Sequence, residues 1–309
     1  MDTHAPAVSL PRVDIDKLSW SAPWLSHLGA RFAQDTPALW SASMDTRSAL
    51  NFAVAILHAH GLPMKTGLGK KLKFIPQDDL PSTRAYEEHI ALTGGVPTRL
   101  NLHDFFNACV WLTFPLTKAV LNARQYEQIQ TRGIKDQRGA ARDALTIFDE
   151  NAAILVTSDP QIADALRRFD WHNSLVATRD MWDDPFNPHP KARAAAYLFG
   201  HALMEKLTEP RKAMCAHAWV VLVNDEWFAM NLVARMADLD TRLAAQLAQH
   251  AFDPHDFCPL PILGVPHFWQ DNRDSAFYND TTVFRAGRMR ELNASKSTAS
   301  KNNTSKTNT

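Results

Sequence analysis

The sequence predicts an α+β fold that is mainly α-helical with a small sheet, in a single domain with an extended C-terminal strap. Three observations lead to this prediction. Stretches with helical periodicity far outnumber runs typical of strands. The 309 residues are 45% hydrophobic and 21% charged, which is an ordinary globular composition that can form a sizeable core. After His255, proline and aromatic residues interrupt every regular pattern but keep the chain apolar, which favours a segment that wraps around the body.

The expected helices follow apolar residues that are spaced three and four apart. They cover residues 45–60, 84–92, 102–112, 115–130, 138–151, 159–169, 192–207 and 238–252. Strands are expected at residues 71–75, 152–156 and 218–223, which are short apolar runs such as "AAILV" and "AWVVLV". Short proline and glycine breaks separate these elements. Because we find no internal repeat and no long linker, one continuous domain is the simpler interpretation.

The ends of the chain differ from its body. Residues 1–16 are punctuated by proline and are expected to be extended, and residues 17–290 are expected to form the globular domain. Residues 291–309 are polar and of low complexity, which predicts a disordered tail. The lysines of this tail are more simply explained by a solvated terminus than by a binding role.

The overall charge excludes binding through a bulk positive field. Lysine and arginine together number 33, as do aspartate and glutamate, so a nucleic acid is an unlikely partner. The three cysteines lie far apart without a CxxC pair, which fits reduced thiols better than disulfides or a zinc ribbon. The start has no basic region followed by an apolar stretch, and no run approaches about 18 apolar residues. We therefore expect a soluble, cytoplasmic protein with no membrane partner.

Common catalytic motifs are absent from the sequence. The stretch "GLPMKTGLGKK" at residues 61–71 faintly resembles a phosphate loop, but its spacing is wrong and a strand-like run follows it instead of a helix. The sequence also lacks a GxSxG elbow, an HExxH motif, an EF-hand loop and a GxGxxG motif after a strand. His58 and His60, at the end of an apolar helix, are more typical of a helix C-terminus than of a metal site.

The helix expected at residues 102–112 has an unusual polar side. Asn101 is its expected N-cap, and a carboxylate at Asp104 is favoured in the first turn. Because successive residues of a helix are turned by about 100°, the apolar residues of this segment fall on one side. The other side carries His103, Asp104, Asn107 and Trp111. Because a tryptophan is unusual on a solvated face, this side is expected to meet protein or a ligand, although a surface face with a stray tryptophan remains an alternative.

Two further helices carry polar stripes. In "RGAARDALTIFDEN", residues 138–151, the polar arc is most simply a solvated face, yet two arginines four residues apart would repel unless something anionic faced them. The arc comprises Arg138, Arg142, Thr146 and Asp149, flanked by Asp143 and Glu150. In the helix expected at residues 192–207, His201 and Glu205 are four apart and apolar residues surround them. A buried carboxylate needs a cation, a hydrogen-bond donor, a metal or a proton, although a purely structural pair would satisfy the same need.

Several long blocks, among them "TGGVPTRLNLHDFFNACVWLTFPLTKAVLN", "RGAARDALTIFDENAA", "FGHALMEKLTEP", "PLPILGVP" and "FYNDTTVFR", resemble a bacterial family catalogued as a domain of unknown function, family 3025. The resemblance covers about Pro81 to Arg285 and implies no particular reaction, fold or cofactor. The matching polar positions are Thr98, Arg99, Asn101, His103, Asp104, Asn107, Lys118, Asn122, Arg138, Arg142, Asp143, Asp149, Glu150, Asn151, His201 and Glu205. The sequence departs from the family pattern near His267, where a small residue is usual.

The first hypothesis is an enzyme of hydrolase type whose pocket is lined by these stripes and which acts on an anionic or phosphorylated small molecule. The candidate catalytic residues are His103, Asp104, Asp149, Glu150, His201 and Glu205. Glu205 or Asp149 would be the general base, and His103 or His201 the acid or a metal ligand. The candidate substrate-binding residues are Arg99, Asn107, Arg138, Arg142, Asp143 and Asn151. A divalent metal remains open, since imidazole and carboxylate suit Zn, Mn or Fe.

The rival hypothesis is a non-catalytic binding or regulatory protein in which arginine–aspartate networks join the helices. In that case the strap or exposed aromatic residues would contact a protein partner that the sequence does not identify. A third hypothesis, nucleic-acid binding through Arg99, Lys118, Arg124 and Arg138, is weaker because acids are as frequent as bases around them. The enzyme hypothesis requires the stripes to meet around one space.

Overall fold

The structure is a computed structural model, and it describes residues 13, 18–28, 44–132 and 140–287. Its helices are α1 (Thr46–Ala59), α2 (Tyr86–Thr93), α3 (Leu102–Thr113), α4 (Pro115–Arg132), α5 (Ala140–Asn151), α6 (Pro160–Arg167), α7 (His201–Lys206) and α8 (Leu232–Gln249). Its strands are β1 (Lys73–Pro76), β2 (Gly95–Thr98), β3 (Ala152–Thr157), β4 (Ala194–Leu198), β5 (Cys215–Leu222) and β6 (Cys258–Pro261). The protein is therefore an α+β fold that is mainly helical, as the sequence predicts.

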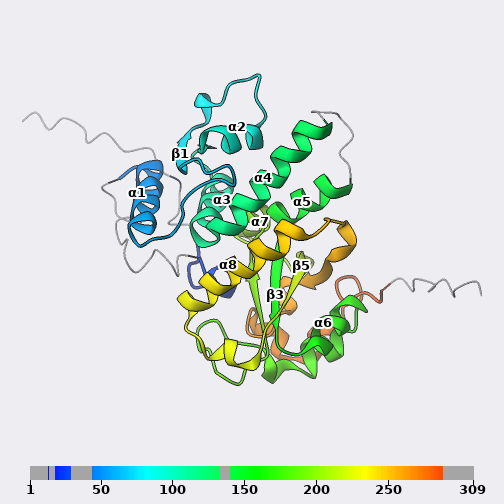
Figure 1. The fold of residues 1–309 in the computed structure, drawn as a ribbon. Helices are drawn as coiled ribbons and strands as arrows, with labels where there is room; N and C mark the ends of the chain where they lie inside the picture. The colour runs from blue at the N-terminus through cyan, green and yellow to red at the C-terminus, as the bar shows by residue number, and fades with distance from the viewer. Residues whose placement is uncertain (1–12, 14–17, 29–43, 133–139, 288–309) are drawn as a thin grey trace, which may run out of the picture.

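The larger sheet has its strands in the order β4-β3-β5-β6. β3 pairs in parallel with β5 and antiparallel with β4, so that Ile154 lies between Trp219 and Tyr197. Every residue of β3 is buried, because this apolar run is covered on both faces of the sheet. In Figure 1, β3 and β5 run through the lower half of the molecule, with α8 crossing in front of them and α6 beside them.

The smaller sheet contains β1 and β2, which are parallel and are connected through α2. Gly94 ends α2 in the left-handed conformation, with φ of 79°. A Cβ atom at Gly94 would lie 2.0 Å from the Lys71 carbonyl oxygen, so that only glycine fits between the helix and the strand. This tight turn allows β2 to run alongside β1.

Complementary charges at the helix ends hold α4 against α8. Asp240 of α8 accepts hydrogen bonds from the Thr117 amide at 2.9 Å and the Thr117 hydroxyl at 2.8 Å, in the first turn of α4. Arg124 of α4 donates to the Leu247 and His250 carbonyls where α8 ends. Because a carboxylate is favourable at a helix N-terminus and a cation at a C-terminus, both contacts stabilise the helix pair.

The C-terminal strap, residues 256–287, packs along the body as the sequence predicts. It adds β6 to the sheet, antiparallel to β5, and continues as short 3₁₀ helices. Its buried side chains include Leu260, Ile262, Val265, Phe268 and Phe284. The strap therefore belongs to the same core as the larger sheet.

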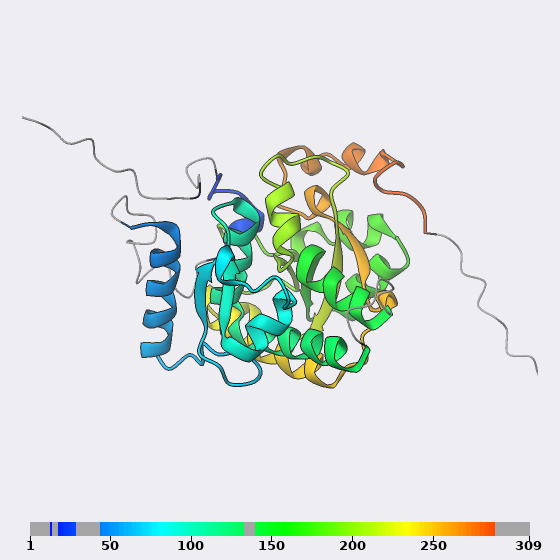
Figure 2. The ribbon, with the colours of Figure 1, turned by 90° about the horizontal axis from the view of Figure 1, so that it is seen from above.

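Figures 1 and 2 both place α1 at the opposite end of the molecule from α6.

The helix expected at residues 192–207 is wrong in its first half. Residues Ala194–Leu198 form β4, which pairs with β3, and the helix begins only at His201 after Gly200. The alanines favour a helix locally, but pairing with a buried strand overrides that propensity. β2 and β6 were not expected, because each contains proline. α8 begins at Leu232, earlier than the expected 238.

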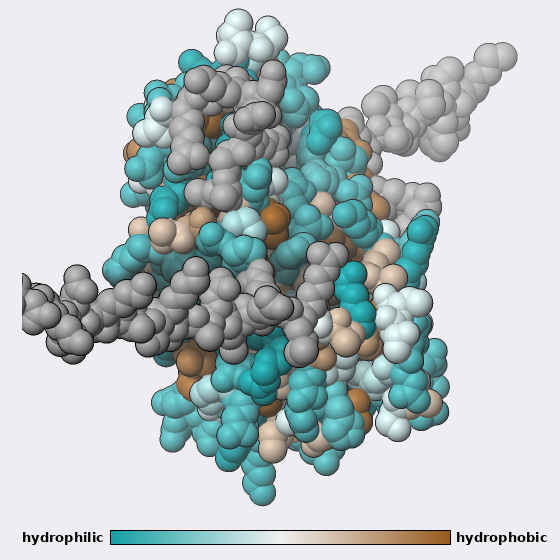
Figure 3. Space-filling view, turned by 90° about the vertical axis from the view of Figure 1, so that its right-hand side faces the viewer, coloured by the Kyte–Doolittle hydropathy of each residue, from teal (hydrophilic) through white to brown (hydrophobic). Residues whose placement is uncertain are grey.

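The surface in Figure 3 is mostly hydrophilic, and its apolar residues are scattered among polar ones. No helix within the described ranges combines the length and the apolar character that crossing a bilayer requires.

Candidate metal centre

The helices α3, α5 and α7 lie close together in the helical half of the molecule (Figure 1). One side chain from each of them meets the others at one place. One potential ligand atom from each of His103, Glu150 and His201 lies within 4.8 Å of the others. We call these three residues the ligand triad. The polar stripes of α3, α5 and α7 therefore converge at these three residues.

Gly200 positions His201 beside the end of α5. It is the N-cap of α7, and a Cβ atom there would lie 2.5 Å from the Asn151 amide nitrogen and 2.6 Å from that of Ala152. The absence of a side chain therefore allows α7 to begin directly against the junction of α5 and β3. As a result, the His201 Nε2 atom lies 3.6 Å from an oxygen of Glu150.

Glu205 orients His103 from the next turn of α7. The Nδ1 atom of His103 lies 3.0 Å from a Glu205 oxygen, so a protonated Nδ1 donates to this carboxylate. A carboxylate behind a histidine is the usual partner of a metal-binding imidazole, because it holds the proton on one nitrogen and leaves the other free. The rings of His103 and His201 are close, with centroids 4.6 Å apart and an interplanar angle of 76°.

The triad lies between the interior and the solvent. The His201 side chain is 5% exposed, whereas those of Glu150 and His103 are 33% and 29% exposed. Burial lowers the pKa of His201 to about 4, so its imidazole is neutral at pH 7 and keeps a lone pair for a ligand. Burial and the neighbouring Asp149 raise the pKa of Glu150 above its ordinary value. A ligand can therefore reach these groups from the side of His103.

A buried ion pair lies next to the triad, on the side of the protein interior. Lys118 of α4 donates to Asp149 of α5 at 2.5 Å, and their side chains are only 5% and 8% exposed. Burial alone would raise the pKa of Asp149, but the charge of Lys118 and its hydrogen bond lower the pKa overall. The Lys118 ammonium also lies 5.4 Å from the centre of the Trp111 ring. Asp149 therefore remains ionised next to His201.

α2 supplies a second polar wall that the sequence analysis missed. Asn122 donates to a Glu87 oxygen at 2.7 Å, and Asn107 donates to the Tyr86 hydroxyl at 3.1 Å. Burial and the charge of Asp149 raise the pKa of Glu87 to about 7. Burial raises the pKa of Tyr86 well above its usual range. No sequence pattern indicated these two residues, because "YEEH" looks like the solvated start of a helix.

Several buried polar atoms in and beside the ligand triad have no hydrogen-bond partner in the described part of the chain. They are His201 Nδ1, Asn107 Oδ1, Asn122 Oδ1 and Trp111 Nε1. Buried polar atoms are nearly always paired, so that unpaired ones gathered around a single cluster indicate a site that is completed by water, an ion or a ligand. The tryptophan expected to meet protein or ligand is 1% exposed, which confirms that its face of α3 is not solvated.

The other candidate residues lie at different distances from the triad. Asp104 forms a two-pronged ion pair with Arg99, at 3.0 Å for both contacts. Arg142 and Asp143 lie nearer the start of α5, and within the described residues neither side chain pairs with the cluster. Asn151 is the last residue of α5 and packs against Gly200. Arg138 lies outside the described residues.

Together these features define an α+β protein with a half-buried histidine–carboxylate cluster between helices. The chain belongs to the family described as "Protein of unknown function (DUF3025)", whose model matches residues 72–288. The resemblance found in the sequence is therefore confirmed, and the matched region contains the whole cluster but not α1. Neither the curated proteins nor the solved structures gave a match to this chain.

Proposed function

We propose that the ligand triad binds one divalent transition metal and that the protein is a cytoplasmic, metal-assisted hydrolase of a small anionic substrate. The observation that carries this proposal is the convergence of two imidazoles and a carboxylate within 4.8 Å, with one imidazole supported by Glu205. Two histidines and one carboxylate suit Zn, Mn or Fe(II), and three protein ligands leave coordination positions open for water and substrate.

The surrounding groups fit hydrolysis. A metal in such a site lowers the pKa of a bound water and so supplies a nucleophile near neutral pH. The Glu205 side chain is 43% exposed to water, whereas Asp149 is buried and held by Lys118. Among the candidate general bases, Glu205 is therefore the better placed.

Two cations on the helices that carry the triad support an anionic substrate. Lys206 is exposed and close enough to Glu150 for its charge to oppose the rise in the pKa of that carboxyl. Arg142 is half-buried on α5 and, within the described chain, has no acidic partner. Such groups favour a phosphorylated or carboxylated small molecule over a neutral one.

The first test measures metal content by inductively coupled plasma mass spectrometry. The wild-type protein, as purified or after reconstitution with Zn²⁺, Mn²⁺ or Fe²⁺, is expected to hold about one ion per chain. His103→Ala and His201→Ala are expected to lose it, and the exposed His172→Ala serves as the control. Absence of metal from the reconstituted wild type, or its retention in both triad variants, would overturn the metal site.

A second variant separates positioning from ligation. Glu205→Gln is expected to weaken metal affinity about 10- to 100-fold, because it removes the carboxylate behind His103. Glu209→Gln, on the exposed segment just after α7, should leave the affinity unchanged. The metal-loaded protein should hydrolyse a phosphomonoester such as p-nitrophenyl phosphate or a related ester. Lack of turnover across such esters would contradict the hydrolase proposal while leaving the metal site standing.

One observation favours the non-catalytic alternative. Three of the four candidate cations for nucleic-acid binding make contacts inside the protein: Arg99 with Asp104, Lys118 with Asp149, and Arg124 with the end of α8. The fourth, Arg138, lies outside the described residues. Such contacts would also suit a binding or regulatory protein in which the cluster only joins helices. In that case the triad variants would lose stability, and the wild type would bind no metal.

A further inference from the structure

A cavity of about 680 Å³ lies between α1, β1 and α2. It is separate from the metal centre, since none of the residues that line it belongs to the ligand triad. His89 lines the cavity, whereas Glu87, two residues earlier on α2, faces the metal centre. Two residues on a helix are about 200° apart, so that the two sites use opposite sides of α2. The volume is typical of sites that enclose a small molecule.

One face of α1 forms a wall of the cavity. Asn51, Val54, Ala55 and His58 follow the spacing of residues on one helix side. The Asn51 side chain accepts from the Phe74 amide at 2.8 Å and donates to the Phe74 carbonyl at 2.9 Å. These two bonds hold α1 at the edge of β1. The apolar lining residues are Val54, Ala55, Met64, Leu72 and Ile75.

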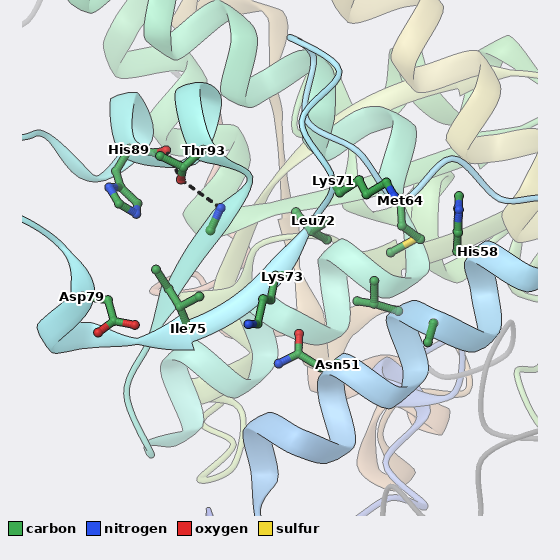
Figure 4. Close-up of a pocket in the computed structure, with 13 residues that line it drawn as sticks. Asn51, His58, Met64, Lys71, Leu72, Lys73, Ile75, Asp79, His89 and Thr93 are labelled. Carbon is green, nitrogen blue, oxygen red and sulfur yellow. Dashed lines mark hydrogen bonds between the residues drawn. The ribbon is translucent and has the colours of Figure 1, made fainter.

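His89 lines the cavity and contains a buried, unsatisfied polar atom. Its side chain extends from α2 toward Asp79 and Ile75 (Figure 4). The residue is 6% exposed, and its Nδ1 atom has no hydrogen-bond partner among the residues that the structure describes. Thr93 holds this end of α2, because its hydroxyl donates to the His89 carbonyl and accepts from the Gly95 amide. A ligand with a polar group at this position would satisfy the buried nitrogen.

The charges around the cavity are mainly positive. Lys71 and Lys73 line it and are exposed, and neither has an acidic partner among the described residues. Asp79 is the only acidic residue in the lining. In the view of Figure 4, Lys73 lies between Asn51 and Ile75, and Lys71 lies near Met64. A small anion attached to an apolar body would match both the lysines and the apolar walls.

We propose that this cavity binds a small organic carboxylate with an apolar body, such as a medium-chain acyl or aryl carboxylate. The apolar walls would bury the body, a lysine at the opening would pair with the carboxylate, and His89 would hydrogen-bond a polar group of the ligand. The site is independent of the proposed hydrolase activity. Much of its wall lies on α1, before the residues that match the family.

The test uses three probes with the same apolar chain, octanoate, octanol and octylammonium, titrated by isothermal titration calorimetry. Octanoate is expected to bind at least tenfold more tightly than either of the others. Ala55→Trp should weaken octanoate binding at least tenfold, because the ring would fill the cavity. Ala59→Trp is the matched control, since Ala59 is also exposed on α1 but does not line the cavity. Equal affinity of the two variants, or of the three probes, would overturn the proposal.

Charge reversal provides a second, independent test. The double variant Lys71→Glu and Lys73→Glu should bind octanoate at least tenfold more weakly and should favour octylammonium. Lys65→Glu with Lys70→Glu makes the same change in net charge at exposed positions outside the lining. If both double variants lose octanoate equally, the attraction is not local and the proposal fails.

A final control separates this site from the metal centre, since a carboxylate can also bind a metal. Octanoate binding should be unchanged in His201→Ala, whether or not that variant has lost a metal. Binding that disappears there would assign octanoate to the metal centre and overturn the cavity proposal. If no probe binds and Ala55→Trp is less stable than Ala59→Trp, another part of the protein or a second copy fills the space. That result would also overturn the proposal.

Discussion

The pKa values of single residues around the ligand triad depend more on burial than on the nearest charge. His201 becomes a weak base because its ring is buried, although Asp149 below it acts in the opposite direction. Glu87 becomes a weak acid for the same reason, despite the opposing effects of Lys118 and Asn122. Desolvation disfavours any charged form, so that burial moves histidine and glutamate in opposite directions. Both residues are then expected to be at least partly neutral near pH 7.

The high pKa of Glu87 predicts a pH-dependent effect on stability. The folded state holds a proton on Glu87 up to about pH 7, whereas the unfolded chain releases it near 4.5. Between these values the folded state binds more protons, so this group lowers stability as pH rises. Glu87→Gln should therefore gain stability relative to wild type between pH 5 and pH 8, by up to about 2 kcal/mol. Urea unfolding at several pH values measures this difference.

Glu88→Gln is the matched control for this prediction, since Glu88 is the next residue on α2 and accepts only an exposed bond from Gln130. Its stability difference from wild type should not show the same rise. A Glu87→Gln difference that stays constant across the pH range would show that Glu87 is ionised throughout.

At the scale of elements, the geometry of the ligand triad depends on how α7 begins. α5 leads directly into β3, and β4 returns beside β3 before Gly200 starts α7. The last turn of α5 and the first turn of α7 are thereby brought together, with Glu150 on one and His201 on the other. A short helix can hold a ligand only if its first residue is firmly placed, and the close contact at Gly200 provides that placement.

Gly200→Ala is expected to disturb this junction. The added methyl would meet backbone atoms of residues 151 and 152, which cannot move aside as a side chain can. We expect a loss of about 1–3 kcal/mol in unfolding free energy, as for overpacking, together with reduced metal content. Gly69→Ala is the control: its added methyl would meet open space, and its φ of 77° costs about 1 kcal/mol without touching the cluster. Wild-type stability for Gly200→Ala would contradict the packing argument.

At the scale of the whole molecule, the strap covers the edge of β5 by adding the last strand of the larger sheet. β6 covers β5, and the Asn272 side chain donates to the Leu263 and Val265 carbonyls within the strap. Phe284, near the end of the strap, packs in the same continuous core as residues of the larger sheet. Without this segment, β5 would expose an unpaired edge and the core would lose several buried side chains.

Two truncations test this role. A chain that ends at His255 is expected to aggregate and to lose its cooperative thermal transition, since the strap is part of the core. A chain that ends at Gly287 should keep its melting temperature within about 2 °C, if the remaining tail adds less than about 1 kcal/mol. Size-exclusion chromatography and circular dichroism measure both outcomes. A folded, monomeric product of the shorter chain would show that the strap is dispensable.

Local patterns in the sequence were sufficient for most elements. The periodicity of α1, α3 and α4, and the buried apolar run of β3, predicted these elements close to their observed bounds. The helix predicted for the alanine-rich run of β4 was wrong, because pairing with β3 overrides the helical propensity of that run. The proline-containing β2 and β6 were missed because proline argues against a strand except at edges.

The sequence by itself determined which helix faces are polar, that His201 and Glu205 share one face, and that a strap follows the last helix. Only the tertiary structure decided that His103 meets Glu205, which is 102 residues away in the chain, and that Glu87 joins the same cluster. The physical reason is that periodicity records which side of a helix is buried but not what that side contacts. Partners so distant in the chain are chosen by how helices pack on the sheet.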